Sequence, residues 1–422
     1  MSAPDPRPGH VATVRRPVLA AALATAVALA GCAGSGAGPD GDAAGPASPP
    51  TARYGGITFG TGTTVAPATT VTPAEPVRGP LGSGQPVTIA FAGDVHFEGE
   101  LRPRLLADPE AVLDPVEPIL ASADLAVVNL ETTITERGTP EDKEYTFRAP
   151  PSAVDAVRAG GVDVVSLANN HGMDFGMTGL EDTLLAEYVT GFPFIGIGLD
   201  DRHAYEPFRI EIRGQRIAVI AATQVLDEHL IPSWTAKPDK PGLASAKEVD
   251  RLTAEVRAAR SDSDTVVVFL HWGTQGQTCP NPQQQVLARQ LADAGADIIV
   301  GTHAHRVLAG GMLGDALVHY GLGNFVFYGT AGKPTAESGI LRVTVTGRRV
   351  DAFEWLPAQI ANGVARPLSG AAADEALARW RALRACTDPV LGELAPGPPP
   401  GTGSSTATGS PPDSTTSGDL GR

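Results

Sequence analysis

Short apolar runs recur along the chain, and polar residues follow five of them directly. The five expected strands cover residues 87–92, 124–128, 162–167, 265–270 and 297–300. Strands that are buried on both faces consist of apolar runs of this kind. Because open α/β sheets bind ligands beyond the carboxyl ends of their strands, the residues that follow these runs are candidates for a functional site.

Segments with other patterns separate these strands. Helical spacing of apolar residues predicts helices at 114–122, 152–159, 178–187, 246–260, 283–294 and 371–385. Further strands are expected at 192–196, 316–320 and 325–328. Two hairpins are expected, 208–212 with 216–221 and 340–346 with 350–356. Strands that alternate with helices, together with two hairpins, predict an α/β fold in which helices surround mixed sheets.

The two ends of the chain differ in composition from this globular part. Residues 1–31 have the features of a lipoprotein signal peptide, namely basic residues, an apolar stretch and the lipobox-like sequence Leu29-Ala30-Gly31-Cys32. Residues 32–85 are rich in Gly, Pro, Ala, Ser and Thr, which predicts a flexible linker. Residues 391–422 have a similar composition, which predicts a disordered tail. One globular domain is therefore expected over residues 86–390.

The signal peptide also predicts where the protein works. We expect lipidation of Cys32, which would hold an extracytoplasmic protein at the cell membrane through a lipid anchor. The alternatives are cleavage without lipidation, which would give a secreted protein, and a short membrane anchor. An extracytoplasmic compartment is oxidising, so the two further cysteines, Cys279 and Cys386, favour a disulfide. Two free thiols or one metal-bound thiolate are the alternatives.

The net charge of the chain indicates which classes of binding partner are to be expected. The formal net charge is −15, so we expect no binding to nucleic acid. An anionic substrate would therefore need a local positive site. Lys143 and Arg148 lie in a polar stretch, and we interpret them as residues of a solvated loop rather than as guides for an anionic polymer.

Histidines gather at the ends of the expected strands. Five of the nine histidines follow these strands, together with carboxylate and amide side chains. The residues at the strand ends are Asp94, His96, Asn129, Glu131, Asn170, His171, His271, His303 and His305. Random placement would scatter the histidines, so this grouping indicates one shared site. The remaining four, His10, His203, His229 and His319, are interpreted as structural or solvent-exposed.

Oxygen and imidazole ligands without cysteine fit zinc, manganese or iron. Asp94 and Glu131 carry two negative charges, so two divalent ions would leave the site positive and suited to a phosphate or carboxylate group. Two ions about 3.5–4 Å apart would contact both the attacking and the leaving oxygen of a displacement. His171, if it is not a ligand, could then protonate the leaving group.

The order of these motifs resembles the calcineurin-like metallophosphoesterases and, more closely, the CapA family of poly-γ-glutamate capsule synthesis proteins. The six motifs are Gly93-Asp94, Asn129-Leu130-Glu131, Asn169-Asn170-His171, His271-Trp272-Gly273, Gly301-Thr302-His303-Ala304-His305 and Gly323-Asn324-Phe325. The chain departs from the pattern at Glu131, where the superfamily has Gly-Asp. It departs again at Gln275 and Ala304, where CapA proteins often carry Glu and Pro.

The resemblance implies a single globular domain with a four-layer α/β/β/α sandwich, similar to metallophosphoesterases, and a site for two divalent metal ions. The implied ligands of the first ion are Asp94, His96 and His305. Those of the second ion are Asn170, His271 and His303. Asp94 could also bridge the two ions, Glu131 would serve in place of the usual aspartate, and His171 would be the catalytic acid.

Three functions are compatible with these residues. The first is a CapA-like metal-dependent hydrolase in the synthesis, anchoring or export of poly-γ-glutamate or another capsule polymer, working with membrane proteins of capsule synthesis. The second is a phosphomonoesterase or phosphodiesterase that acts on a small or lipid-linked phosphate. The third is a non-catalytic scaffold for capsule assembly. Structural zinc sites are usually closed by four ligands, whereas this set is larger and includes a spare histidine, which favours a hydrolase.

Overall fold

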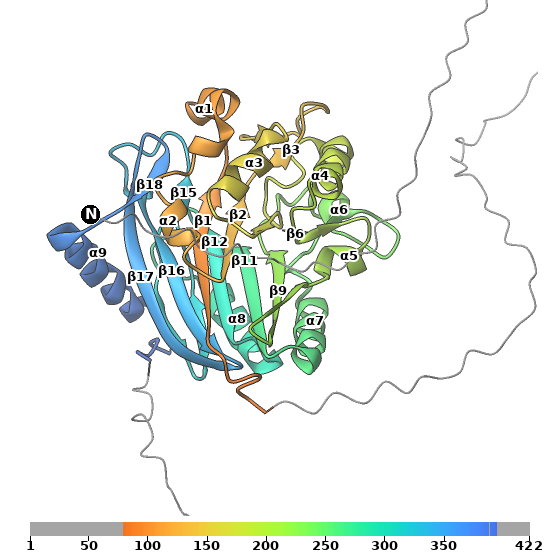
Figure 1. Cartoon of the computed structure of the whole chain (residues 1–422). Coiled ribbons are helices and arrows are strands. Elements are labelled where there is room, and N and C mark those ends of the chain that lie inside the picture. The colour runs from red at the N-terminus through yellow and green to blue at the C-terminus, as the bar shows by residue number, and fades with distance from the viewer. Residues whose placement is uncertain (1–78, 388, 395–422) are drawn as a thin grey trace, which may run out of the picture. The chain divides into compact units, whose positions relative to one another are not determined.

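Two mixed β-sheets lie at the centre of the computed structural model, which describes residues 79–387 and 389–394 (Figure 1). The eight-stranded sheet has the order β15 (Asn324–Val326), β18 (Val364–Pro367), β17 (Arg349–Ala361), β16 (Glu337–Thr346), β1 (Val87–Val95), β2 (Leu125–Leu130), β5 (Val164–Ser166) and β6 (Phe194–Ile195). The six-stranded sheet has the order β13 (Gly310–Leu313), β14 (Ala316–His319), β12 (Ile298–His303), β11 (Thr265–Trp272), β9 (Gln215–Thr223) and β8 (Phe208–Ile212).

The helices and the short strands connect and cover these sheets. The helices are α1 (Leu101–Ala107), α2 (Glu117–Leu120), α3 (Ser152–Ala159), α4 (Gly176–Thr190), α5 (Asp201–Tyr205), α6 (Ile231–Trp234), α7 (Val249–Asp262), α8 (Pro282–Ala294) and α9 (Gly370–Ala382). The short strands pair as β3 (Thr133–Ile134) with β4 (Arg148–Ala149), and β7 (Ile197–Gly198) with β10 (Gly242–Leu243).

Three apolar cores separate the layers. One core lies between the two sheets, where Phe91 of β1 approaches Phe269 of β11 with ring centroids 6.5 Å apart. A second core lies between the eight-stranded sheet and helices α1, α3 and α4. The third lies between the six-stranded sheet and helices α7 and α8. The order is therefore helix, sheet, sheet, helix, which confirms the expected four-layer α/β fold (Figure 1).

Local sequence signals explain how the helices begin and end, and α8 is an example. The Asn281 side chain accepts a hydrogen bond from the main-chain amide of Gln284, and the Gln284 side chain accepts one from the main-chain amide of Asn281. Pro282 occupies the first turn, where a missing N–H group costs nothing. Gly295 ends the helix with φ +114°, a backbone conformation that glycine adopts without strain. These signals fix the direction in which the chain enters β12.

Most of the expected elements are present, and the differences have physical reasons. The expected helix over 114–122 is reduced to α2, because Pro115 and Pro118 lack the N–H groups that a longer helix needs. Helix α1 and strands β13 and β18 were not expected, since none of them carries a sustained apolar pattern. The expected signal peptide, Cys32 and most of the expected linker and tail lie outside the described residues. Within residues 79–387 and 389–394, no helix is long and apolar enough to cross a bilayer.

Cys279 and Cys386 form a disulfide, with Cα atoms 5.3 Å apart. The bond joins the segment after β11 to the short 3-10 turn that follows α9. The segment after β11 in turn contacts the loop after β12, since the Gly276 amide donates a hydrogen bond to the Ala304 carbonyl at 2.8 Å. The C-terminal turn is thereby fastened close to the carboxyl ends of β11 and β12.

His319 of β14 is buried between two tryptophans, in keeping with its interpretation as a structural residue. Its ring centroid lies 4.7 Å from that of Trp355 and 5.7 Å from that of Trp380. Trp380 donates a hydrogen bond from Nε1 to His319 Nε2 at 3.1 Å, while Nδ1 has no hydrogen-bond partner in the described part of the chain. Burial, and to a lesser extent the nearby charge of Arg384, lower the pKa of His319 to about 3.

Because His319 is buried with a lowered pKa, we expect the free energy of unfolding to fall in acid. Because the pKa of His319 is about 3 in the folded protein and near 6.5 when unfolded, the unfolded chain binds more protons between these values. The free energy of unfolding is therefore unaffected by His319 above about pH 6.5, and proton uptake by this residue in the unfolded chain lowers it by roughly 1.4 kcal/mol per pH unit below that pH. His319→Gln keeps an acceptor for Trp380 and should flatten this loss between pH 7 and 4.5. Urea unfolding at several pH values measures it.

The matched control is His229→Gln, because His229 is exposed. This variant should lose stability in acid with the same slope as the wild type. If the free energy of unfolding fell with the same slope against pH in all three proteins, the pKa of His319 would be the same in the folded and the unfolded state.

Candidate metal centre

The carboxyl ends of the parallel strands bring the expected ligands together. In the eight-stranded sheet, Asp94 lies at the end of β1 and Glu131 directly follows β2. In the six-stranded sheet, His271 lies at the end of β11 and His303 ends β12. Strands β1 and β2 are parallel, as are β11 and β12, so each pair points its polar residues at one edge. The two sheets pack face to face, and their edges meet at these residues.

Asp94 is fully buried and is held from several sides. Asn129 donates a hydrogen bond from Nδ2 to Asp94 Oδ1 at 2.8 Å, and the His303 amide donates to Oδ2 at 3.3 Å. His305 Nδ1 lies 3.3 Å from the same Oδ2 atom. Asn169 donates to Asn129 Oδ1 at 3.0 Å and so fixes the amide that binds the carboxylate. The position of Asp94 therefore depends on residues from both sheets.

Glu131 is a buried carboxylate that lacks donors. Its side chain is fully buried, and neither oxygen has a hydrogen-bond partner among the residues that the structure describes. Oε1 lies 3.5 Å from His271 Nε2 and 3.9 Å from His171 Nε2. Burial, and next the nearby Asp94, raise the pKa of Glu131 well above its ordinary value. A buried charged group without a partner is costly, and a bound cation would remove that cost, so the donor set fits a metal ion.

Three side chains converge on one nitrogen of His271. Its Nε2 atom lies 2.7 Å from Asn170 Oδ1, 3.1 Å from His303 Nδ1 and 3.5 Å from Glu131 Oε1. Its other nitrogen, Nδ1, lies 2.9 Å from Thr302 Oγ1. Burial lowers the pKa of His271 well below its ordinary value and that of His303 to about 3. Both imidazoles are therefore neutral, which is the form that binds metals.

The carboxylates and histidines form two groups that could each hold an ion. One consists of Glu131, His271 and His303, and the other of Asp94, Glu131 and His305. Within each group the ligand atoms lie within 4.8 Å of one another. Glu131 belongs to both groups. Asn170 adds an amide oxygen beside the first group.

The structure does not bring His96 into either group, although we expected it to bind the first ion. Its Nδ1 atom accepts a hydrogen bond from the Glu98 amide at 3.2 Å, and its Nε2 atom lies 3.4 Å from the Tyr328 amide nitrogen. Its ring stacks on Phe147 with centroids 4.6 Å apart. Both ring nitrogens thus face main-chain amides, and His96 forms part of the wall around the centre.

His171 lies beside the centre with one nitrogen directed at Glu131 and the other at Asp174. Its Nδ1 atom is 2.5 Å from Asp174 Oδ2, and Phe147 stacks on its ring at 4.0 Å. Burial lowers the pKa of His171, and the hydrogen bond to Asp174 partly opposes this. The spacing Asn170-His171-x-x-Asp174 was visible in the sequence, but nothing in the apolar pattern indicated that Asp174 turns back to the histidine.

The interpretation of Lys143 as a residue of a solvated loop is wrong. Its side chain is 5% exposed, and its Nζ atom lies 2.6 Å from Asp174 Oδ1 and also contacts the Asn170 carbonyl. Sequence analysis missed it because a lysine in a polar stretch is usually exposed. Arg148 lies with its guanidinium 4.8 Å from the centre of the Phe175 ring.

The backbone of the loop after β12 is unusual. His303 has φ +89° and His305 has φ +51°, conformations that residues other than glycine rarely adopt. Such backbone is retained where the surrounding structure holds it, and it is frequent at functional sites. Here it directs both imidazoles into the cluster, since His303 reaches His271 and His305 reaches Asp94.

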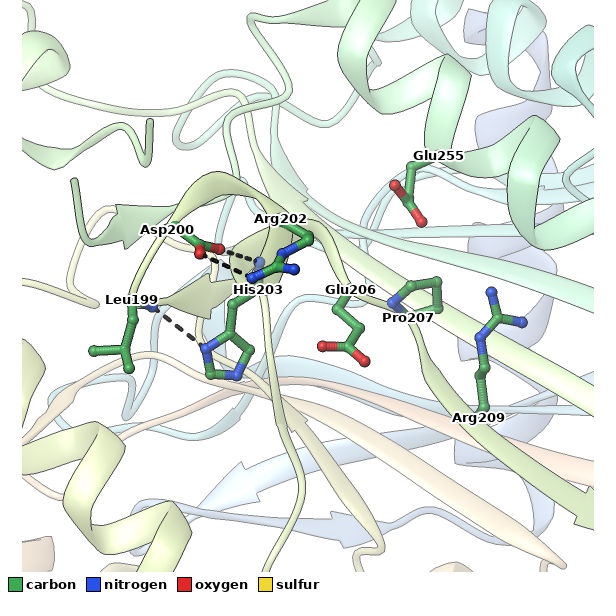
Figure 2. A pocket seen from close by; sticks show the side chains of 8 residues that line it. All are labelled: Leu199, Asp200, Arg202, His203, Glu206, Pro207, Arg209 and Glu255. Atoms are coloured by element: carbon green, nitrogen blue, oxygen red, sulfur yellow. Dashed lines mark hydrogen bonds and ion pairs between the residues drawn. The ribbon is translucent and has the colours of Figure 1, made fainter. Parts of the chain in front are cut away.

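An open surface depression of about 590 Å³ lies away from these residues, between α5, β8 and α7 (Figure 2). Acidic and basic side chains alternate around it, including Asp200, Arg202, Glu206 and Arg209. None of the residues that line it belongs to either metal-binding group. His203 lines this depression and is therefore a histidine outside the candidate metal centre.

Residues 88–329 match the family model for bacterial capsule synthesis protein PGA_cap. The chain belongs to this family. The match spans more than half of the chain and contains all six motifs of the sequence analysis, so the resemblance to CapA proteins is confirmed.

The chain is also similar to two proteins of Bacillus species. The chain is 29% identical over 288 residues to the PGA biosynthesis protein CapA of Bacillus subtilis, covering 67% of this chain and 74% of that protein. It is 28% identical over 264 residues to the capsule biosynthesis protein CapA of Bacillus anthracis, covering 61% of this chain and 63% of that protein.

Solved structures with similar architecture are more distant. A hypothetical protein from Thermus thermophilus has a TM-score of 0.42 at 19% identity, with 65% of this chain and all of that chain covered. The 5′-nucleotidase from Candida albicans has a TM-score of 0.37 at 11% identity, with 71% of this chain and 58% of that chain covered.

Proposed function

We propose that the protein is a metal-dependent hydrolase of capsule polymer synthesis whose centre binds two divalent ions, manganese, zinc or iron. The observation that carries this proposal is Glu131. It is fully buried, neither of its oxygens has a hydrogen-bond partner within residues 79–387 and 389–394, and it is shared by the two groups of side chains that could hold a metal. A bound cation would offset the cost of burying such a carboxylate, and Glu131 would be available to an ion in either group.

In this proposal, each ion has its own ligands in addition to Glu131. Asp94 and His305 would hold the first ion. His271, His303 and the Asn170 amide oxygen would hold the second. Bound divalent ions would act as Lewis acids toward a phosphoryl or carbonyl oxygen. Two carboxylates do not cancel the charge of two divalent ions, so the centre would attract an anionic polymer or a phosphoester to an otherwise acidic protein.

The chain itself would supply orientation and proton transfer. His171 is held by Asp174 through Nδ1, which leaves Nε2, 3.9 Å from Glu131, to carry a proton to or from a substrate in the centre. Phe147 stacks on the imidazole and limits its rotation. Because the ligands are largely buried, few competing water molecules would weaken the electrostatic contacts with a bound anion.

The biological assignment rests on the family. The named relatives act in the biosynthesis of capsule or poly-γ-glutamate, and we extend that process to this chain. The expected lipid on Cys32 would place the domain outside the cell membrane, where membrane proteins of capsule synthesis could pass it a polymer. An esterase for a small or lipid-linked phosphate is the second candidate, favoured by the pairing of a cationic centre with a proton-carrying histidine.

Metal content tests the proposal. The purified domain should contain close to two equivalents of divalent metal by mass spectrometry, and His303→Ala/His305→Ala should contain less than half an equivalent. Hydrolysis should be measured on phosphomonoesters, phosphodiesters and γ-glutamyl polymers, and the double variant should lose activity in parallel with metal.

His203→Ala is the matched control, because His203 lies in the surface depression of Figure 2 and not in the centre. It should keep both the metal and the activity. Equal metal content in the wild type and the double variant would remove the basis of the proposal and favour the non-catalytic scaffold.

A further inference from the structure

A buried ammonium group lies behind the candidate acid. Lys143 belongs to the segment between β3 and β4, and only 5% of its side chain is exposed. Its Nζ atom lies 2.6 Å from Asp174 Oδ1 and 3.7 Å from Asp227 Oδ2. It also lies 5.0 Å from the centre of the Trp234 ring, which covers it on another side. Removing a lysine from water is costly, so its place behind Asp174 requires a reason.

Asp174 is the link between Lys143 and His171. One of its carboxylate oxygens, Oδ1, receives Lys143. The other, Oδ2, accepts a hydrogen bond from the Phe147 amide at 2.6 Å and lies 2.5 Å from His171 Nδ1. The Asp174 amide in turn donates to Thr133 Oγ1 at 3.0 Å. Because both oxygens are engaged, rotation of the carboxylate would break a contact on each side.

We propose that Lys143 is a positioning residue that fixes the Asp174 carboxylate, and through it the ring orientation and tautomer of His171. With Nδ1 bound to Asp174, the proton that His171 exchanges with a substrate is confined to Nε2. The side-chain partners of Lys143 are Asp174 and, at 3.7 Å, Asp227, and neither is a proposed ligand, so Lys143 would act on the His171 imidazole through Asp174. Its consequence for catalysis rests on the proposed hydrolase function, whereas its effect on His171 does not.

The contacts of Lys143 explain why a lysine suits this place. A lysine offers three donors on one nitrogen, and here they meet Asp174, the Asn170 carbonyl and the side of Asp227. The bond to the Asn170 carbonyl joins Lys143 to the loop that carries both Asn170 and His171. A purely structural bond of this kind would stabilise the loop without affecting the tautomer of His171, and this difference can be measured.

The first measurement does not require catalysis. In proton NMR spectra, the Nδ1 proton of His171 should appear far downfield because of its short bond to Asp174, and its signal is assigned by its absence in His171→Gln. In Lys143→Met this signal should move upfield by more than 1 ppm or broaden beyond detection, while in Lys143→Arg it should be largely retained. Arg148→Met is the matched control, because it removes a cation of the same part of the chain that does not contact Asp174.

The second measurement uses the leaving group. An ester of p-nitrophenol needs little help from an acid, whereas an alkyl phosphate needs a proton on its leaving oxygen. Lys143→Met should therefore lose about ten-fold or more in kcat on the alkyl ester beyond its loss on the p-nitrophenyl ester, with KM little changed. The double variant with His171→Gln should be no slower than His171→Gln alone, because both act on one proton.

The outcomes separate the two proposals. An unchanged Nδ1 proton in Lys143→Met overturns the positioning role, whatever the activity. Equal losses on both esters overturn its catalytic consequence. Absence of any phosphoester hydrolysis in the wild type counts against the proposed function alone, because the NMR comparison still decides the role of Lys143. Lys143→Gln, whose amide is too short to reach Asp174, replaces the methionine variant if circular dichroism shows that the latter does not fold.

Discussion

Replacement of His171 by glutamine is expected to lower the turnover of an alkyl phosphoester by about 10²–10⁴-fold, while the metal content stays at the wild-type value. The expected loss is large because Nε2 of His171 faces Glu131 at 3.9 Å, while His171 belongs to neither of the two ligand groups of the described residues. Glutamine is close in size and keeps an amide that can face Asp174. The stacked Phe147 and the rest of the wall should therefore remain in place.

Steady-state kinetics and metal analysis on the same preparation check this expectation. His229→Gln is the control for the substitution itself, since that histidine is exposed. Loss of metal together with activity would instead assign His171 to the ligands. Unaltered turnover on the alkyl ester would exclude it as the proton donor.

Replacement of Gly93 by alanine is expected to destabilise the protein by about 3 kcal/mol or more and to lower its metal affinity. A methyl group at this position would lie 1.8 Å from the Gly323 carbonyl oxygen, which belongs to the backbone. That carbonyl accepts a hydrogen bond from the Asp94 amide at 3.0 Å, and β1 and β15 pair directly beyond it. The backbones would have to separate, and this would displace Asp94.

Urea unfolding of metal-free protein measures the first effect, and metal titration of the folded fraction measures the second. Gly79→Ala is the control, because a methyl group there would meet no atom within 4 Å. It should change the free energy of unfolding by less than about 0.5 kcal/mol. Comparable stability of the two variants would contradict the close approach of β1 to Gly323.

The sequence predicts the proposed metal ligands better than it predicts the residues that surround and support them. The proposed ligands Asp94, Glu131, His271 and His303 could be found because each lies at or directly after the end of a buried apolar strand, and parallel strands bring such residues to one edge. His96 follows the same rule but is not in either group, because the chain after β1 turns its ring toward Phe147. Position along a strand predicts which edge a residue reaches, and the local turn decides where its side chain points.

The residues that support the site could not be predicted in this way. Lys143 and Asp174 lie in polar segments without apolar periodicity, and their burial arises only when the segment between β3 and β4 folds over the loop after β5. Lys143 and Asp174 contact each other although they are 31 residues apart in the sequence. The identity of such pairs depends on the tertiary structure, whereas the strands and helices depend mainly on local pattern.

The disulfide divides the proposed ligands into two sets. Cys279 and Cys386 close a covalent ring that contains His303 and His305, whereas Asp94, Glu131, Asn170 and His271 lie on the chain that precedes it. Metal ions held by both sets would fasten the ring to the rest of the polypeptide at a second place. If the centre binds metal as proposed, disulfide formation and metal binding would each restrict the segment between Cys279 and Cys386, and the binding of metal would favour closure of the disulfide.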